Sequence, residues 1–135
     1  MTYEEMIKKA QSYRLRKKPT NKEHRLQCAC VEWFEYAHKK YSTLMYAVPN
    51  GGRRDAVTGA LLKAEGVKAG VSDLNFDLPN RFYHGLRIEI KTSIGRQSKV
   101  QKAYQLAVEA VGYKYVVCRS LDEFMKIITD YLNDV

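Results

Sequence analysis

Cysteine is scarce in this chain of 135 residues, and an odd count of three cannot pair completely into a disulfide framework. Two of the cysteines are separated by a single residue in a helical pattern, where their side chains diverge by about 200°. We therefore expect free thiols in a reducing compartment. The chain also lacks a Cys-x-x-Cys pair, and its histidines lack ligand spacing, which argues against a zinc site. The cysteines are Cys28, Cys30 and Cys118, and the histidines are His24, His38 and His84.

Long apolar runs are absent as well. No stretch approaches the ~18 apolar residues that a membrane-spanning helix requires. The first ten residues, MTYEEMIKKA, do not have a signal-peptide profile. We expect a soluble, cytoplasmic protein.

Acidic residues are outnumbered by basic ones. Asp and Glu total 15 against 23 Lys and Arg, which gives a net charge of +8 and a pI near 9.4. This balance favours a polyanionic partner, because each neutralised phosphate of a nucleic acid releases bound counterions. The alternative is a basic surface without a partner. The charge alone favours nucleic acid.

The length suits one compact domain, and the composition, 45% hydrophobic and 28% charged, supports a folded core. Apolar periodicity, capping boxes and glycines predict helices at 2–18, 20–40, 55–65 and 98–111, and a last one from 120. Strands are predicted at 44–48, 73–78, 84–91 and 113–118. This order indicates an α/β fold with a central mixed four-stranded sheet flanked by helices. The second and third strands should form an antiparallel hairpin, and the helix after them should make a right-handed crossover to the fourth.

The polar face of the predicted hairpin is rich in charge. Period-two alternation places Asp73, Asn75 and Asp77 on one strand opposite Arg87, Glu89 and Lys91 on the other. Carboxylates on one surface are candidate ligands for Mg²⁺, which prefers oxygen. A lysine projecting beside them could hold the attacking water or stabilise charge on a phosphate. The alternative is an ordinary solvated strand face.

An Asp at a strand start followed by Glu-x-Lys on the partner strand resembles the PD-(D/E)xK nuclease superfamily. Five further segments occur in an order that resembles the virus-type replication-repair nuclease (VRR-NUC) family: VPNGGRR, GALLKAEGVKAGVSDL, GLRIEIK, Ser98-x-x-Gln101 and GYKYVV. The resemblance covers residues 22 to 120 or so. It implies a PD-(D/E)xK nuclease-like fold, with a nuclease domain at 21–135 and an N-terminal helical extension at 1–20.

The resemblance also implies roles for individual residues. Asp73 and Glu89 would be metal-binding carboxylates, and the backbone carbonyl of Ile90 a third ligand. Lys91 would be the catalytic lysine, and Gln101 would orient it or the attacking water. Glu23 would lie near the metal, although it could serve only as the acid of a capping box with Thr20. Ser72 stands where the family usually has proline, which changes loop stiffness more than chemistry.

The implied activity is Mg²⁺-dependent hydrolysis of phosphodiester bonds in DNA, with Mn²⁺ as a substitute. Stand-alone members of the family resemble Holliday-junction resolvases, so a homodimer that cuts four-way junctions or other branched DNA in phage or mobile-element replication and repair is expected. The rivals are a non-catalytic DNA-binding module and a sequence-specific restriction or homing endonuclease. Candidate contacts to DNA phosphates, each of which could also be a solvated surface charge, are Arg53, Arg54, Lys63, Lys68, Arg96 and Lys99.

Overall fold

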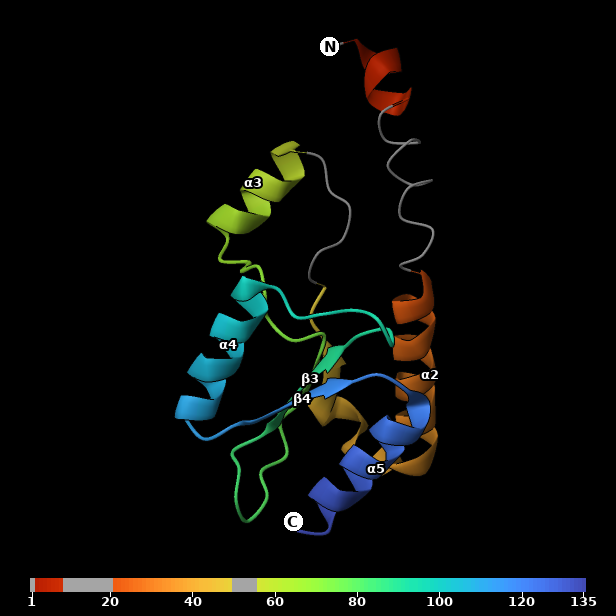
Figure 1. The fold of residues 1–135 in the computed structure, drawn as a ribbon, viewed down its shortest axis with the longest axis vertical. Coiled ribbons are helices and arrows are strands. Elements are labelled where there is room, and N and C mark those ends of the chain that lie inside the picture. The colour runs from red at the N-terminus through yellow and green to blue at the C-terminus, as the bar shows by residue number, and fades with distance from the viewer. Residues whose placement is uncertain (1, 9–20, 50–55) are drawn as a thin grey trace.

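The computed structural model describes residues 2–8, 21–49 and 56–135. A short helical segment covers 3–8, which is the described part of the helix predicted at 2–18. The main elements then follow in the predicted order (Figure 1). They are α2 (Asn21–Ala37), the 3₁₀ helix η2 (Lys39–Leu44), β1 (Met45–Ala47), α3 (Ala56–Ala64), β2 (Leu74–Phe76), β3 (Leu86–Ile90), α4 (Lys99–Ala110), β4 (Lys114–Cys118) and α5 (Leu121–Leu132).

The four strands form one mixed sheet in the order β1-β2-β3-β4. Strands β1 and β2 are antiparallel, β2 and β3 are antiparallel, and β3 and β4 are parallel. The predicted hairpin and the parallel pair joined through α4 are therefore confirmed. Figure 1 shows α4 on one side of β3 and β4, with α2 and α5 on the other.

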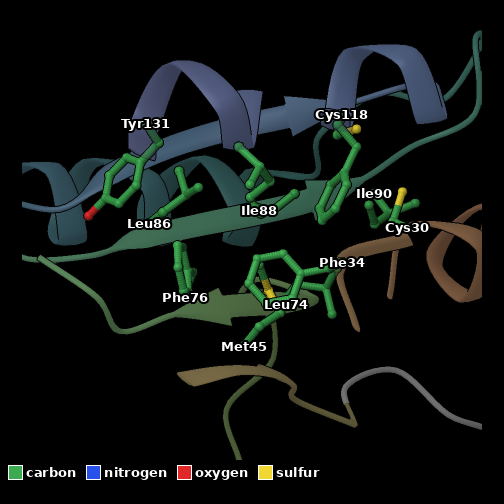
Figure 2. Packing of buried hydrophobic residues seen from close by; sticks show 12 residues of the cluster. Cys30, Phe34, Met45, Leu74, Phe76, Leu86, Ile88, Ile90, Cys118 and Tyr131 are labelled. Atoms are coloured by element: carbon green, nitrogen blue, oxygen red, sulfur yellow. The ribbon is translucent and has the colours of Figure 1, made fainter. Parts of the chain in front are cut away.

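The hydrophobic core fills the space between the sheet and the pair α2 and α5 (Figure 2). Alternate residues of β2 and β3 point into it, because successive side chains of a strand face opposite sides of the sheet. Phe76 lies at its centre, with ring centroids 5.3 Å from Phe34 and 5.8 Å from Tyr131. The other fully or almost fully buried members are Cys30, Met45, Leu74, Leu86, Ile88, Ile90, Cys118, Phe124 and Ile128.

The start signals of the two C-terminal helices are confirmed. Ser98 caps α4 by accepting from the N–H of Gln101, and the Gln101 side chain accepts from the N–H of Ser98. Ser120 accepts from the N–H of Glu123 at the start of α5. The Glu123 carboxylate bonds the N–H of Arg119 rather than that of the capping serine, so the second box is not reciprocal as the sequence pattern predicted.

The prediction that the helix from residue 20 extends to Lys40 is wrong, because α2 ends at Ala37. The His38 ring packs against Trp33 and Phe34, and its backbone leaves the helical region. A 3₁₀ turn then leads directly into β1. None of the described helices is long and apolar enough to cross a membrane.

Candidate active site

Asp73, directly before β2, and Glu89 of β3 lie side by side. Leu74 pairs with Ile88 in the antiparallel ladder, so the residues one step outward, Asp73 and Glu89, are opposite each other on the other face. Asp73 Oδ2 accepts a hydrogen bond from the N–H of Ile90 at 2.7 Å, which fixes its carboxylate against the end of β3. Like charges directly opposite each other on paired strands destabilise a sheet unless a positive charge compensates them.

This pair of carboxylates is unusual because Glu89 is deeply buried and Asp73 is half-buried. Glu89 is 3% exposed, and no donor in the described part of the chain reaches its Oε2. Burial, followed by the charge of Asp73, raises the pKa of Glu89 to about 8. Burial also raises the pKa of Asp73, although the N–H of Ile90 opposes that shift. Both groups are therefore costly to ionise without a compensating positive charge.

Gln101 and Lys91 both point at the other oxygen of Glu89. Gln101 Nε2 donates to Glu89 Oε1 at 2.8 Å, and Lys91 Nζ lies 3.8 Å from the same atom. The capping box with Ser98 holds the Gln101 oxygen, so this side chain is fixed at both ends. The four predicted residues from β2, β3 and α4 thus meet at one place.

These side chains line a pocket of about 290 Å³. One wall is the loop before Asp73, where Gly70 has a φ of +84°. A Cβ at this glycine would come within 2.5 Å of Val100 Cγ1 and 2.8 Å of its backbone, so a side chain cannot fit between the loop and α4. The lining residues are Glu23, Ala69, Gly70, Asp73, Glu89, Lys91, Ser98, Val100 and Gln101.

Glu23 reaches the pocket from the first turn of α2. Its Oε1 accepts from the N–H of Thr92, two residues after β3 ends, at 3.3 Å. Among residues 2–8, 21–49 and 56–135, no three Asp, Glu, His or Cys side chains gather as a metal site. Glu23 therefore lies beside the carboxylate pair without forming a triad with it. Thr20, its predicted capping partner, lies outside the described residues.

The remaining polar residues predicted on this face have partners of their own. Asp77 receives hydrogen bonds from Arg87 Nη1 at 3.0 Å and from the Tyr46 hydroxyl at 2.9 Å. Asn75 accepts from the Ser72 hydroxyl at 2.6 Å. Of the three strand acids in the predicted row, Asp77 is thus engaged elsewhere, while Asp73 and Glu89 face the pocket.

Four of the predicted phosphate contacts are exposed, as a role in binding DNA requires: Lys63, Lys68, Arg96 and Lys99. Lys68 and Lys99 each adjoin a pocket-lining residue, Ala69 and Ser98. Lys63 is in the last turn of α3, and Arg96 follows the turn after β3. Arg53 and Arg54 lie outside the described residues.

Comparison with known proteins decides which fold this is. No protein-family model and no curated protein matches the sequence. A solved structure described as a VRR_NUC domain protein superposes with a TM-score of 0.73 and 28% sequence identity. The match covers 83% of this chain and 88% of that one. The chain has the VRR-NUC fold. The resemblance predicted from the sequence is therefore confirmed.

The VRR-NUC fold accounts for where the pocket forms. The hairpin brings Asp73 beside Glu89, and the crossover through α4 returns Gln101 over the same end of the sheet. The donor set suits a divalent metal: two carboxylates, one of them with a buried oxygen that lacks a donor among the described residues, and raised pKa values. Mg²⁺ is commonly held by one or two carboxylates together with water.

Ser72 and Arg119 support the segments around this site, although the sequence did not single them out for that role. Ser72 is fully buried, and its hydroxyl lies 3.2 Å from the Tyr104 hydroxyl of α4 as well as bonding Asn75. Arg119 Nη1 donates to the carbonyls of Thr92 and Gly95 at 2.6 and 2.7 Å. The departure from the family's proline marked Ser72, but no local pattern marks Arg119.

Proposed function

We propose that this protein is a metal-dependent endonuclease that hydrolyses phosphodiester bonds in DNA. One observation carries the proposal: the buried carboxylate of Glu89 and the half-buried carboxylate of Asp73 lie opposite each other in the β2–β3 pair, with Lys91 and Gln101 directed at the same pocket. Structural stability does not require this arrangement, since burying like charges together costs free energy. A site that holds a cation and a phosphate explains the cost.

Asp73 and Glu89 would hold the metal, and the Ile90 carbonyl and Glu23 are the further candidate ligands. A bound Mg²⁺ or Mn²⁺ would lower the pKa of a water and neutralise negative charge that develops on the phosphate. Gln101 keeps Glu89 in one rotamer through the hydrogen bond to Oε1. Because Gln101 is itself held by Ser98, the carboxylate is preorganised before any ligand arrives.

Lys91 supplies the positive charge of the chain itself. Its side chain is 13% exposed, so the ammonium acts in a partly desolvated setting where electrostatic interactions are stronger than in water. It can stabilise charge on a phosphate oxygen or hold the attacking water by hydrogen bonding. Lys91 precedes the turn bound by Glu23 and Arg119, so its backbone lies on fixed structure.

DNA is the polyanion that best suits this site and the net charge of +8. The exposed Lys68 and Lys99 would contact the phosphates on either side of the pocket. We further propose that the enzyme selects branched DNA, such as a four-way junction, and that it acts as a homodimer with two pockets related by two-fold symmetry.

The direct test compares cleavage of an end-labelled four-way junction with cleavage of linear duplex of matching sequence, in Mg²⁺ and in EDTA. We expect the junction to be cut in Mg²⁺ only. Lys91→Ala should lower the rate by ~10²- to 10³-fold, the scale for loss of one group that stabilises charge in the transition state. Lys126→Ala is the matched control, because this exposed lysine lies on α5 and pairs with Asp130 of the same helix.

Each result has a distinct meaning. Equal cutting of junction and duplex would leave the nuclease in place and remove the preference for branched DNA. Binding of DNA without any cutting, in Mg²⁺ or Mn²⁺, would overturn the nuclease and favour the non-catalytic DNA-binding module. Junctions with scrambled arm sequences test the remaining rival, because a restriction or homing enzyme would lose activity on them.

A further inference from the structure

The four residues after Lys91 form a tight turn beside the pocket. The N–H of Gly95 donates to the carbonyl of Thr92 at 3.1 Å, which closes the turn. A Cβ at Gly95 would lie 3.4 Å from both Glu23 Oε1 and Lys91 Cδ, so the turn packs directly on two pocket residues. Figure 1 shows this β3–α4 connection reaching the N-terminal end of α2.

Two distant elements hold this turn in place. Arg119, between β4 and α5, donates from one nitrogen to the carbonyls at both ends of the turn, Thr92 and Gly95. Glu23 of α2 accepts from the N–H of Thr92. Surface loops usually move more than the elements they connect. This one is tied to the sheet, to α2 and to the segment before α5.

The turn presents a large apolar side chain to solvent. Ile94 is 88% exposed and occupies the third position of the turn. Other exposed apolar residues, such as Leu106 and Val111, lie along or at the end of α4. Ile94 differs from them because it stands at the tip of a fixed turn, three residues from Lys91, with the exposed Arg96 two residues beyond.

We propose that Ile94 is a wedge that inserts between neighbouring bases of the DNA next to the phosphate being cut. Proteins that unstack DNA often use an exposed Ile, Leu, Phe or Met for this purpose. Unstacking costs a few kcal/mol per base step, and the cost is lower where stacking is already weakened, as at a branch point. A wedge on a rigid turn loses little conformational entropy on insertion. This inference rests on the proposed function and adds a physical basis for selecting branched DNA.

Arg119 is a positioning residue in this scheme, because it acts on DNA only through the turn. Its planar guanidinium reaches two carbonyls from one nitrogen, whereas a lysine ammonium lies on a more flexible stem. Arg119→Lys should therefore keep the charge but loosen the turn. The wedge would still be present, held less firmly.

The test places 2-aminopurine, whose fluorescence rises on unstacking, at the branch point of a four-way junction. Lys91→Ala serves as the background so that the DNA stays intact in Mg²⁺. Binding of this protein should raise the fluorescence severalfold. Adding Ile94→Ala should abolish most of the rise, and adding Arg119→Lys should reduce it. Adding Leu106→Ala, which removes another largely exposed apolar side chain, from α4, should preserve it.

A cleavage measurement complements the fluorescence. In the otherwise native protein, Ile94→Ala should lower the ratio of junction cleavage to hydrolysis of bis(p-nitrophenyl) phosphate by about tenfold, because this small ester has no bases to unstack. An unchanged ratio, or a 2-aminopurine signal that survives Ile94→Ala, would overturn the wedge. If the native protein hydrolyses neither substrate, the nuclease proposal fails, while the fluorescence still decides whether Ile94 unstacks bound DNA.

Discussion

The two faces of the central sheet are made from alternate residues of the same strands, yet the side chains buried on them differ in character. On the face under α2 and α5, Leu74, Phe76 and Ile88 are fully buried among other apolar groups. On the face under α4, Glu89 and Ser72 are buried just as deeply. The first face releases apolar surface from water, and the second removes polar groups from water at a cost.

Within one sheet, one face stabilises the fold and the other carries the candidate active site. The core face can stabilise the fold through ~25 cal/mol for each Å² of apolar surface removed from water. That stabilisation offsets the unfavourable burial of the carboxylate pair on the opposite face. Loss of a core ring and loss of the buried charge should therefore change stability in opposite directions. Four predictions examine the two faces, in order of decreasing effect.

The largest effect is expected on the core face. Phe76→Ala removes a fully buried ring that contacts Phe34 and Tyr131, and should lower the free energy of unfolding by about 3 to 5 kcal/mol. Urea unfolding followed by circular dichroism measures this loss. Tyr36→Ala, at a side chain that is 91% exposed, is the control and should change stability little. A loss below about 1 kcal/mol for Phe76→Ala would show that this face does not carry the core.

Glu89→Gln should have the opposite effect to Phe76→Ala and raise the free energy of unfolding. Because burial raises the pKa of Glu89 from 4.5 to about 8, the folded protein holds a proton there that the unfolded chain releases. The metal-free protein should lose stability as pH rises between these values. At pH 9, Glu89→Gln should raise the free energy of unfolding by an amount on the order of 3 kcal/mol and abolish DNA cleavage.

Thermal melts of both proteins in EDTA at pH 5 and pH 9 measure this effect. Glu32→Gln, at an exposed position of α2, is the control and should keep the pH dependence of the native protein. Equal melting temperatures for Glu89→Gln and the native protein at pH 9 would contradict the cost assigned to the buried carboxylate.

Added Mg²⁺ should offset part of the free-energy cost of the carboxylate charges at Asp73 and Glu89 in the native protein. A ligand at a hundred times its Kd stabilises the folded state by about 2.7 kcal/mol. We expect a concentration-dependent rise in melting temperature at pH 7.5 that Asp73→Asn eliminates. Differential scanning calorimetry checks this without any activity assay. A rise of equal size in Asp73→Asn would place the bound ion elsewhere.

Ser72→Ala should have the smallest effect of the four. The substitution leaves Asn75 Oδ1 and the Tyr104 hydroxyl with one partner fewer beneath α4, which should cost about 1 to 2 kcal/mol. Ser93→Ala, in the exposed turn after β3, is the matched control. If both substitutions are neutral in urea unfolding, the Ser72 hydroxyl does not tie α4 to the sheet.

Local signals were the reliable part of the sequence. The capping pair Ser98 and Gln101 marked the start of α4 correctly, and Gly66 follows α3 with a φ of +101° as expected at a helix end. The alternation around Asp73 and Glu89 placed both on the polar face and brought them together through the hairpin. These features depend on residues close in the sequence or on one antiparallel pairing.

Local sequence patterns did not predict the contacts between distant segments. Glu23 bonds a backbone N–H 69 residues away, and Arg119 holds a turn 24 to 27 residues before it. The end of α2 at Ala37 was also missed, where His38 packs on Trp33 and Phe34 instead of continuing the helix. The contacts of Glu23 and Arg119 depend on which distant segments the fold brings together.

The sequence by itself determined the order of the elements, the two characters of the sheet faces and the residues of the carboxylate pair, because period, capping and alternation are local properties. Only the tertiary structure decided that Glu89 is deeply buried, that Gln101 and Lys91 share one of its oxygens, and that the turn carrying Ile94 is held from both sides. Burial and shared partners arise when separate elements pack together, so they are properties of the fold rather than of any one segment.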